Sequence, residues 1–365
     1  MQTQGTTINS DAQNVYIGID VHLKSWKVSV MLDNTVFKTF AQEPCAKVLS
    51  NYLGRNFPGS TYYSAYEAGF SGYSTHRKLQ EEGITNIIVN PADIPTTDKD
   101  RRQKEDKRDS RKIAKALRNG ELEGIYVPSI SSMDFRTLVR FRSTLVKEVS
   151  RNKNRLKSLL KFQGITIPPE LHSASSHWSS RFTKWLEEEV KFSSDYGNLT
   201  IKTLIAITQY YREQLLELTR VLRQIPKDSH YGKRIKLLNT IPGVGLITAV
   251  TLIAEIDDIN RFKTLDRFCS YAGIVPSTNS SGEKETVRGI TPRSNRPLRN
   301  IIIESSWMAV RNNPVLAKKF NELCYKMDAN KAIIRVAKKM LAIIRYVMIH
   351  EKEYKIDVNE KQKQL

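Results

Sequence analysis

The run Val-Tyr-Ile-Gly-Ile-Asp at residues 15–20 joins a β-prone apolar stretch to a carboxylate, Asp20. Short runs rich in Val, Ile and Tyr are typical of β-strands. Residues 27–32, Lys-Val-Ser-Val-Met-Leu, predict a second strand after a short turn, and residues 35–41 predict a third. The chain therefore opens on strands joined by short turns, with an acid at the end of the first strand.

Helices and strands alternate after this opening. Helices are predicted near 45–55, 72–83 and 107–119, and strands at 61–66 and 86–90. Gly120 ends the last of these helices, because glycine is favoured just past a helix C-terminus. Hairpin strands followed by this alternation predict an α/β domain with a mixed sheet, which is the element order of a ribonuclease-H-like fold.

Three further acids lie in the same region. Glu67 ends the run Tyr-Tyr-Ser-Ala-Tyr-Glu, and Asp106 and Asp109 are one helical turn apart, so they share a helix face. Singly, each acid has an ordinary explanation as a turn-former, a surface acid or an ion-pair partner. Together, four carboxylates repel one another unless a divalent cation lies between them. Asp20, Glu67, Asp106 and Asp109 therefore predict a two-metal site for phosphoryl chemistry, with Mg²⁺ as the cation that prefers such oxygens.

The charge balance indicates a polyanionic partner. The chain has 58 Lys and Arg against 38 Asp and Glu, a formal net charge of +20, and nucleic acid is the leading candidate. Basic residues cluster near the acids and along a helix predicted for 131–163. Those predicted to contact phosphates are Lys104, Lys107, Arg108, Arg111, Arg140, Arg151 and Arg155. The plainer alternatives are a basic loop and a solvated helix surface.

The rest of the chain predicts helices. The amphipathic helix at 131–163 and helices near 178–191 and 198–225 predict a long helical hairpin of coiled-coil type. Residues 233–350 predict a helical domain that contains the turn Ile-Pro-Gly-Val-Gly at 241–245. This turn resembles that of a helix-hairpin-helix motif, in which Gly243 and Gly245 would offer backbone N–H groups to a phosphate. Any helix–helix turn could look the same.

A loop is predicted for residues 273–295, which are rich in Gly, Pro, Ser, Thr and Asn. It contains Asn-Ser-Ser-Gly at 279–282, where an exposed serine could attack a phosphodiester if a base or a metal activated it. Arg288, Arg293 and Arg299 follow and could clamp phosphates. On composition alone, a simple linker is the better explanation of this stretch.

The predicted compartment is the cytoplasm. Cys45, Cys269 and Cys324 lack metal-ligand spacing and predict reduced thiols. The first residues are polar, without a signal-peptide pattern, and no apolar run approaches the ~20 residues that span a bilayer. We therefore expect a bacterial cytoplasmic protein with no membrane partner, associated with the nucleoid when it acts.

The predicted organisation has five parts. They are a disordered N-terminus at 1–14, the α/β domain at 15–127, the helical linker at 128–232, the helical C-terminal domain at 233–350 and a charged tail at 351–365 that we expect to be disordered.

Several motifs together resemble the transposases of the insertion-sequence 110/1111 family. They are Gly-Ile-Asp-Val-His at 18–22, Tyr-Glu-Ala-Gly-Phe-Ser-Gly at 66–72, Asp-Lys-Arg-Asp-Ser-Arg-Lys-Ile-Ala at 106–114, Ile-Pro-Gly-Val-Gly at 241–245 and Asn-Ser-Ser-Gly at 279–282. The similarity covers about 15–350. Each motif alone is weak, and the combination is specific.

The resemblance implies a RuvC-like DEDD nuclease domain, a coiled-coil linker and a C-terminal transposase domain with a nucleophilic serine. It implies an RNA-guided, site-specific DNA recombinase in which a bridge RNA encoded by the element pairs with donor and target DNA. It also implies a homo-oligomer, a dimer of dimers. Asp20, Glu67, Asp106 and Asp109 would bind Mg²⁺, and Ser281 would be the nucleophile, with Ser280 in reserve.

One stretch departs from the family pattern. Where many relatives have Gly-Ile-(Ser/Thr)-Lys-X-Gly-Asn, residues 289–295 are Gly-Ile-Thr-Pro-Arg-Ser-Asn, which makes Ser294 a distant third candidate nucleophile. Two other functions stay open. In a plain metal-dependent nuclease or junction resolvase, water would be the nucleophile. In a non-catalytic RNA- or DNA-binding protein, the basic helix would matter and the acids would not.

Overall fold

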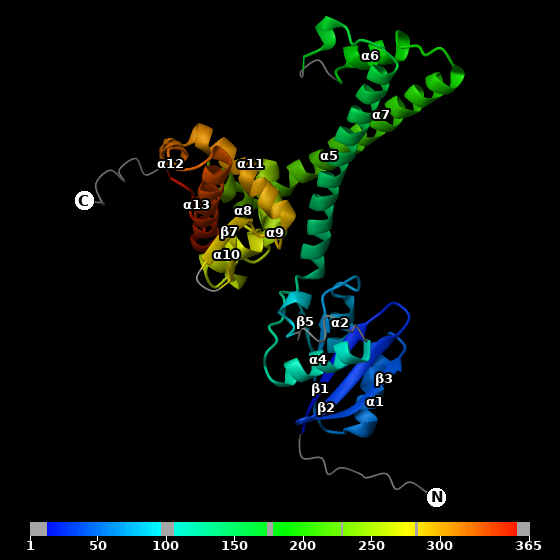
Figure 1. Cartoon of the computed structure of the whole chain (residues 1–365), viewed down its shortest axis with the longest axis vertical. Coiled ribbons are helices and arrows are strands. Elements are labelled where there is room, and N and C mark those ends of the chain that lie inside the picture. The colour runs from blue at the N-terminus through cyan, green and yellow to red at the C-terminus, as the bar shows by residue number, and fades with distance from the viewer. Residues whose placement is uncertain (1–12, 96–105, 174–177, 228, 282–283, 356–365) are drawn as a thin grey trace, which may run out of the picture. The chain divides into compact units, whose positions relative to one another are not determined.

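The computed structural model describes residues 13–95, 106–173, 178–227, 229–281 and 284–355. The chain divides into two compact units, residues 1–127 and 128–365. Within the described residues, the first unit is a sheet with helices and the second is largely helical (Figure 1).

A five-stranded mixed sheet forms the N-terminal unit, in the order β3-β2-β1-β4-β5. β1 (Asn14–Val21), β2 (Trp26–Leu32) and β3 (Thr35–Gln42) make an antiparallel meander. β4 (Thr61–Glu67) and β5 (Thr85–Val89) are parallel to β1 on its other side. The predicted mixed sheet is confirmed, and the opening run of the sequence is its central strand.

Helices cover both faces of this sheet, because side chains along a strand alternate between faces. Ile17 and Ile19 share one core with residues of α1 (Ala46–Asn56) and α2 (Ser74–Glu81). On the opposite face, Ala65 and Val89 pack with Ile113 of α4 (Asp106–Arg118). The helix that carries two of the predicted metal ligands therefore lies on the face opposite to α1 and α2.

α4 approaches β1 most closely at Gly18. A Cβ atom there would lie 1.9 Å from the Ser110 carbonyl oxygen and 2.5 Å from the Ala114 nitrogen. Only glycine, which has no side chain, permits this spacing. Beside it, the buried hydroxyls of Ser110 and Ser29 are 2.8 Å apart and hydrogen-bonded. The sequence pattern Ile-Gly-Ile thus lets a helix backbone rest on a strand backbone.

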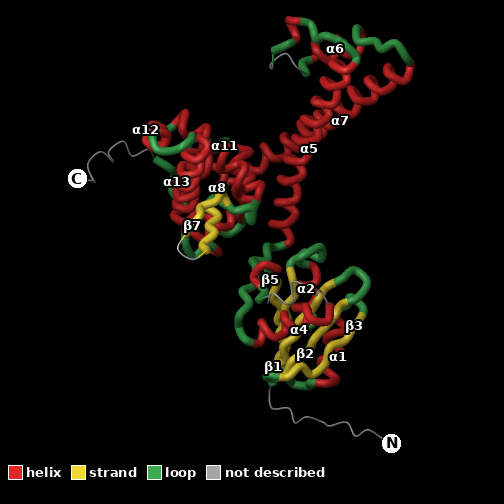
Figure 2. Tube along the Cα trace, in the orientation of Figure 1, coloured by secondary structure: helices red, strands yellow, loops and turns green. Residues whose placement is uncertain are grey.

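Two long helices, α5 (Ile130–Phe162) and α7 (Asp195–Gln224), pack against each other in the C-terminal unit (Figure 2). Their outer ends and α6 (Ser180–Glu188) enclose a core that contains Trp178, Phe182 and Trp185. The predicted helical hairpin is present, and its coiled-coil character remains a prediction.

The inner ends of these helices join a second, larger core. Val139 of α5 and Leu222 of α7 belong to it, with α9 (Leu246–Ile256) and α13 (Ala329–His350) at its centre. The surrounding helices are α8 (Ser229–Asn239), α10 (Leu265–Ala272), α11 (Arg296–Asn312) and α12 (Pro314–Cys324).

Three predictions are corrected by the structure. Residues 276–290 are not a loop, because β6 (Pro276–Ser281) and β7 (Lys284–Ile290) form an antiparallel hairpin. Hydrophobic alternation gave no signal, since backbone pairing in a polar hairpin does not require an apolar face. Within the tail predicted to be disordered, Tyr354 is held in place, because its N–H donates to Thr240 Oγ1 at 2.8 Å, whereas residues 356–365 lie outside the described residues. At the other end Asn14 begins β1, whereas residues 1–12 of the predicted disordered N-terminus lie outside the described residues.

Candidate active site

Asp20 and Glu67 lie at the carboxyl ends of neighbouring parallel strands. Ile19 of β1 is paired with Tyr66 of β4, and Asp20 and Glu67 are the next residues of their strands. Asp20 is two residues past Gly18 and Glu67 two past Ala65, so both belong to the face that α4 covers. The fold therefore brings these two acids to one edge and one face of the sheet.

Asp109 comes to the same face on α4. It directly precedes Ser110, whose carbonyl lies over Gly18. Asp106 is the first residue of α4, and its side chain lies outside what the structure describes. The contact at Gly18 thus fixes where the helix that bears both acids crosses the strand that bears Asp20.

Two of the described carboxylates, Asp20 and Asp109, have basic partners. His22 Nε2 is 3.0 Å from Asp20 Oδ2, and Lys112 Nζ is 3.5 Å from Asp109 Oδ1. Among the side chains that the structure describes, no three of His, Cys, Asp or Glu are gathered closely enough to hold a metal ion. Carboxylate oxygens are nonetheless the donors that hard divalent cations prefer.

The candidate nucleophiles lie next to the tip of the β6–β7 hairpin. Ser280 is paired with Glu285, and Ser281 with Lys284 in the last pair before the tip. The side chains of residues 277–288, including that of Arg288, lie outside the described part of the chain. Both serines are therefore the last two residues of β6.

Ser294, the third candidate, is held at the base of that hairpin. Its hydroxyl accepts a hydrogen bond from Arg299 Nη2, while Arg299 Nη1 donates to the Thr291 carbonyl at 2.8 Å. A Cβ atom on Gly273 would lie 2.2 Å from Ser294 Cβ, so this serine packs against the backbone at the end of α10. Ser294 and Arg299 thus anchor the segment that returns from the hairpin to α11.

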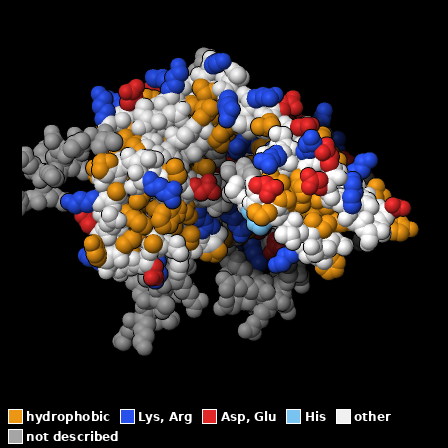
Figure 3. Space-filling model, turned by 90° about the horizontal axis from the view of Figure 1, so that it is seen from above, with side chains coloured by type: hydrophobic (Ala, Val, Ile, Leu, Met, Phe, Trp, Pro, Cys, Tyr) orange, Lys and Arg blue, Asp and Glu red, His pale blue; other side chains and the backbone are white. Residues whose placement is uncertain are grey.

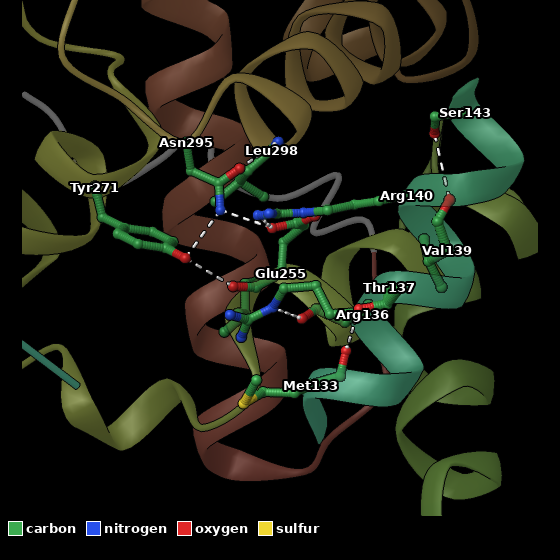
Figure 4. Close-up of polar contacts among 12 residues, drawn as sticks. Met133, Arg136, Thr137, Val139, Arg140, Ser143, Glu255, Tyr271, Asn295 and Leu298 are labelled. Carbon is green, nitrogen blue, oxygen red and sulfur yellow. Dashed lines mark hydrogen bonds and ion pairs between the residues drawn. The ribbon is translucent and has the colours of Figure 1, made fainter. Parts of the chain in front are cut away.

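A buried carboxylate ties this segment to the long helix α5 (Figure 4). Glu255 of α9 is fully buried, and Arg140 of α5 donates to its two oxygens from Nε and Nη2, each at 2.7 Å. Asn295 Nδ2 donates to Glu255 Oε2 at 2.8 Å and to the Tyr271 hydroxyl at 2.9 Å. Asn295 Oδ1 also caps α11 by accepting from the Leu298 N–H at 3.1 Å. Arg140, predicted to contact phosphate, is here part of a structural network.

The sequence analysis did not single out Glu255. A signal was present, because Glu255 is the lone charge in the otherwise apolar run Leu-Ile-Ala-Glu-Ile at 252–256. A lone acid in a fully apolar helix predicts a buried charge that needs a cationic partner. The partner, 115 residues away, has no such signal.

The other predicted phosphate-binding residues are placed as follows. Arg111 Nε donates to Thr39 Oγ1 at 2.9 Å, Arg155 Nη1 to Asn152 Oδ1 at 3.3 Å, and Arg151 is paired with Glu148 on the same helix. Arg293 is exposed, and its N–H donates to Thr291 Oγ1 at 3.3 Å. Lys104 lies outside the described residues, as do the side chains of Lys107 and Arg108.

Positive charges crowd one another on the helical hairpin. Burial lowers the pKa of Lys153, and the nearby charges of Arg212 and Lys157 lower it further. Figure 3 shows blue Lys and Arg side chains spread over one face of the molecule, with red acidic and orange apolar side chains among them. The net charge of +20 over the whole chain favours contact with a polyanion.

The turn at 241–245 packs against α11. Gly243 has φ +86°, and a Cβ atom there would lie 2.4 Å from the Ser305 carbonyl oxygen. Gly245 is exposed and precedes the first turn of α9. One glycine of the predicted phosphate-binding turn therefore serves packing, and the other presents its backbone at a helix start.

Two family models match the chain. One, described as "Transposase" and built on DEDD transposases of the IS110 type, matches residues 17–164. The other, "Transposase IS116/IS110/IS902 family", matches residues 235–321. They cover the acids of the N-terminal unit and most of the β6–β7 region with its surrounding helices. The fold and these matches define a transposase of the DEDD class.

Curated relatives agree. A putative transposase y4qE of Sinorhizobium fredii is 29% identical over 245 residues, which are 67% of this chain and 58% of the relative. The transposase for insertion sequence element IS1533 of Leptospira borgpetersenii is 25% identical over 81% of this chain and 85% of its own length. The transposase for insertion sequence element IS1111A of Coxiella burnetii is 24% identical over 77% and 76%. The chain belongs to the IS110 family of transposases, enzymes that act on DNA.

The family is one in which a divalent metal is the general requirement. No helix among the described residues is both long enough and apolar enough to cross a membrane.

Proposed function

We propose that this transposase is a site-specific recombinase that cuts and rejoins donor and target DNA under the guidance of a bridge RNA encoded by its own element. The observation that carries the catalytic part is the placement of Asp20 and Glu67. They lie at the carboxyl ends of neighbouring parallel strands, on the face where the close contact at Gly18 holds α4, the helix of Asp106 and Asp109. The guide RNA and a dimer-of-dimers assembly rest on the family resemblance.

Asp20, Glu67, Asp106 and Asp109 are the proposed metal ligands. Their oxygens suit Mg²⁺, and a cation held there would polarise the scissile phosphate. Lys112 offsets the negative charge of this edge beside Asp109, and Lys107 and Arg108 are basic neighbours of the acids in the sequence. They would also draw the DNA backbone toward it.

Ser281 is the proposed nucleophile. Its Oγ would form a bond to the scissile phosphorus while the bond from phosphorus to a deoxyribose oxygen breaks, and the hydroxyl proton would pass to the departing oxygen. One phosphodiester replaces another, so the strand can be rejoined by the reverse attack without an external energy source. The anchoring of Ser294 by Arg299 and Gly273 makes Ser294 the weaker candidate.

Trapping of protein–DNA adducts tests this assignment. Full-length protein, co-expressed with the non-coding flank of its element, is incubated with DNA and Mg²⁺ and denatured to reveal covalent complexes. Wild type and Ser280→Ala should form the adduct, and Ser281→Ala and Asp20→Asn should not. An adduct of normal yield in Ser281→Ala would remove that serine from the role.

The second candidate is a metal-dependent nuclease in which water attacks. It is favoured by the same acids and needs no serine. Undiminished strand cleavage by Ser281→Ala without any adduct, together with loss of cleavage in Asp20→Asn, would establish it. RNA guidance is tested separately, by sequencing RNA that co-purifies with the protein. Absence of the flanking transcript would count against guidance and leave the chemistry untouched.

A further inference from the structure

The N-terminal unit has a basic cavity that begins beside the acids, since one of its lining residues, Lys112, is 3.5 Å from Asp109. It has a volume of about 450 Å³ and lies between the second half of α4 and the turn that joins β2 to β3. Four cationic side chains line it, those of Arg111, Lys112, Lys115 and Arg118, and its lining residues include no acid. A concave surface with charge of one sign concentrates a polyanion more strongly than scattered surface charges do.

Charge is segregated along α4. Both of its acids, Asp106 and Asp109, lie in the first four residues, and all four charged residues after Ser110 are the cations of the cavity. Cations near a helix C-terminus also stabilise the helix through its dipole. The helix dipole alone does not explain why these four cations line a single cavity together with the turn between β2 and β3.

The lining is suited to a sugar-phosphate chain. Arg111 is oriented by its 2.9 Å hydrogen bond from Nε to Thr39 Oγ1, which uses one of the five N–H groups of the guanidinium. Arg118 Nη1 donates to Asn119 Oδ1 at 3.2 Å. Met31 and Val36 give the cavity an apolar wall, against which a deoxyribose ring can pack.

The distance from the acids is set by the helix. Arg118 is nine residues past Asp109, or about 14 Å along the axis at ~1.5 Å per residue. Phosphates of one duplex strand recur every ~3.4 Å along the DNA axis, so on a strand that runs along α4 the far end of the cavity, at Arg118, lies about four phosphates from Asp109. We propose that this cavity binds the sugar-phosphate backbone of the DNA strand whose scissile phosphate lies at the acids. This inference rests on the proposed function, in which this edge of the sheet cuts DNA.

The test is the salt dependence of DNA binding by the full-length protein in EDTA, where no cleavage is needed. The cavity variant is Lys115→Gln with Arg118→Gln. The control, Lys47→Gln with Lys78→Gln, removes the same charge from α1 and α2, which cover the opposite face of the sheet. Binding of a labelled duplex from the element's end is measured between about 50 and 200 mM NaCl.

Each lost duplex phosphate contact lowers the slope of log K against log salt by about 0.9, so the cavity variant should lose about 1.8. The ratio of wild-type affinity to variant affinity should then be ~12-fold larger at about 50 mM NaCl than at about 200 mM NaCl. Lys115→Gln alone should lose about half of the slope change, and the control should keep the wild-type slope.

Equal slopes for the cavity and control variants would overturn the proposal, whatever the adduct experiment shows. A loss confined to RNA, with duplex binding unchanged, would overturn it as well. Conversely, the cavity variant can show its loss of slope even if Ser281 is not the nucleophile or the acids do not bind metal. Binding of DNA in EDTA requires neither the serine nor the metal.

Discussion

Removing Arg140 is expected to destabilise the C-terminal unit strongly. Its guanidinium makes two hydrogen bonds of 2.7 Å to Glu255, whose side chain is 0% exposed. In Arg140→Ala, the buried Glu255 carboxylate keeps its hydrogen bond from Asn295 but loses the positive charge that compensates it. Breaking a buried ion pair in this way costs about 3–5 kcal/mol. Because the Arg140 side chain is 48% exposed, water can partly replace it, and we expect a value near about 3 kcal/mol.

The free energy of unfolding is measured by urea denaturation of the full chain. Circular dichroism reports the unfolding transition of the helical unit. Each kcal/mol lost should lower Tm by about 2–4 °C for a unit of this size, or about 6–12 °C in total. The double variant Arg140→Ala with Glu255→Gln should be less destabilised than the sum of its single variants, because the charge that lacks a partner is gone.

Arg151→Ala is the matched control on the same helix. Its pair with Glu148 is partly exposed, and such pairs contribute about 0–1 kcal/mol. The reasoning is refuted if Arg140→Ala costs no more than Arg151→Ala, or if the effects at positions 140 and 255 simply add.

Three other predictions concern glycines and thiols. Gly18→Ala should destabilise the N-terminal unit by at least about 1–3 kcal/mol in thermal melts, because its Cβ would lie 1.9 Å from a backbone oxygen, whereas Gly54→Ala, with nothing within 4 Å, should be neutral or stabilising. Gly243→Ala should lower the Tm of the C-terminal unit, since φ +86° and the contact with α11 both exclude a side chain, and an unchanged melt would contradict this. Burial raises the pKa of the Cys269 thiol to about 11, so at pH 8 iodoacetamide should label exposed Cys324 and reach Cys269 only after denaturant is added.

Much of the N-terminal unit was predictable because its strands carry apolar, β-branched runs with distinct ends. β1 and β4 were placed within a residue or two, and with them the ends at which Asp20 and Glu67 stand. That Asp109 lies on the same sheet face was not predictable, because it depends on a contact between Gly18 and Ser110, 92 residues apart in the sequence.

The C-terminal unit shows the limits of local patterns more clearly. Helix periodicity located α5, but it could not show that Arg140 of this helix is paired with Glu255 of α9. An arginine on a polar helix face looks the same in sequence whether it binds phosphate or a carboxylate. The β6–β7 hairpin was missed for a related reason, since its strands consist largely of Ser, Thr, Asn and charged residues.

The spacing between the strand of Asp20 and the helix of Asp109 is fixed by main-chain atoms in direct contact at Gly18. A distance set by main-chain contact does not change when neighbouring core side chains are replaced by larger or smaller ones. Relatives with quite different interiors can therefore retain one distance between these two acids, provided that position 18 never acquires a methyl group.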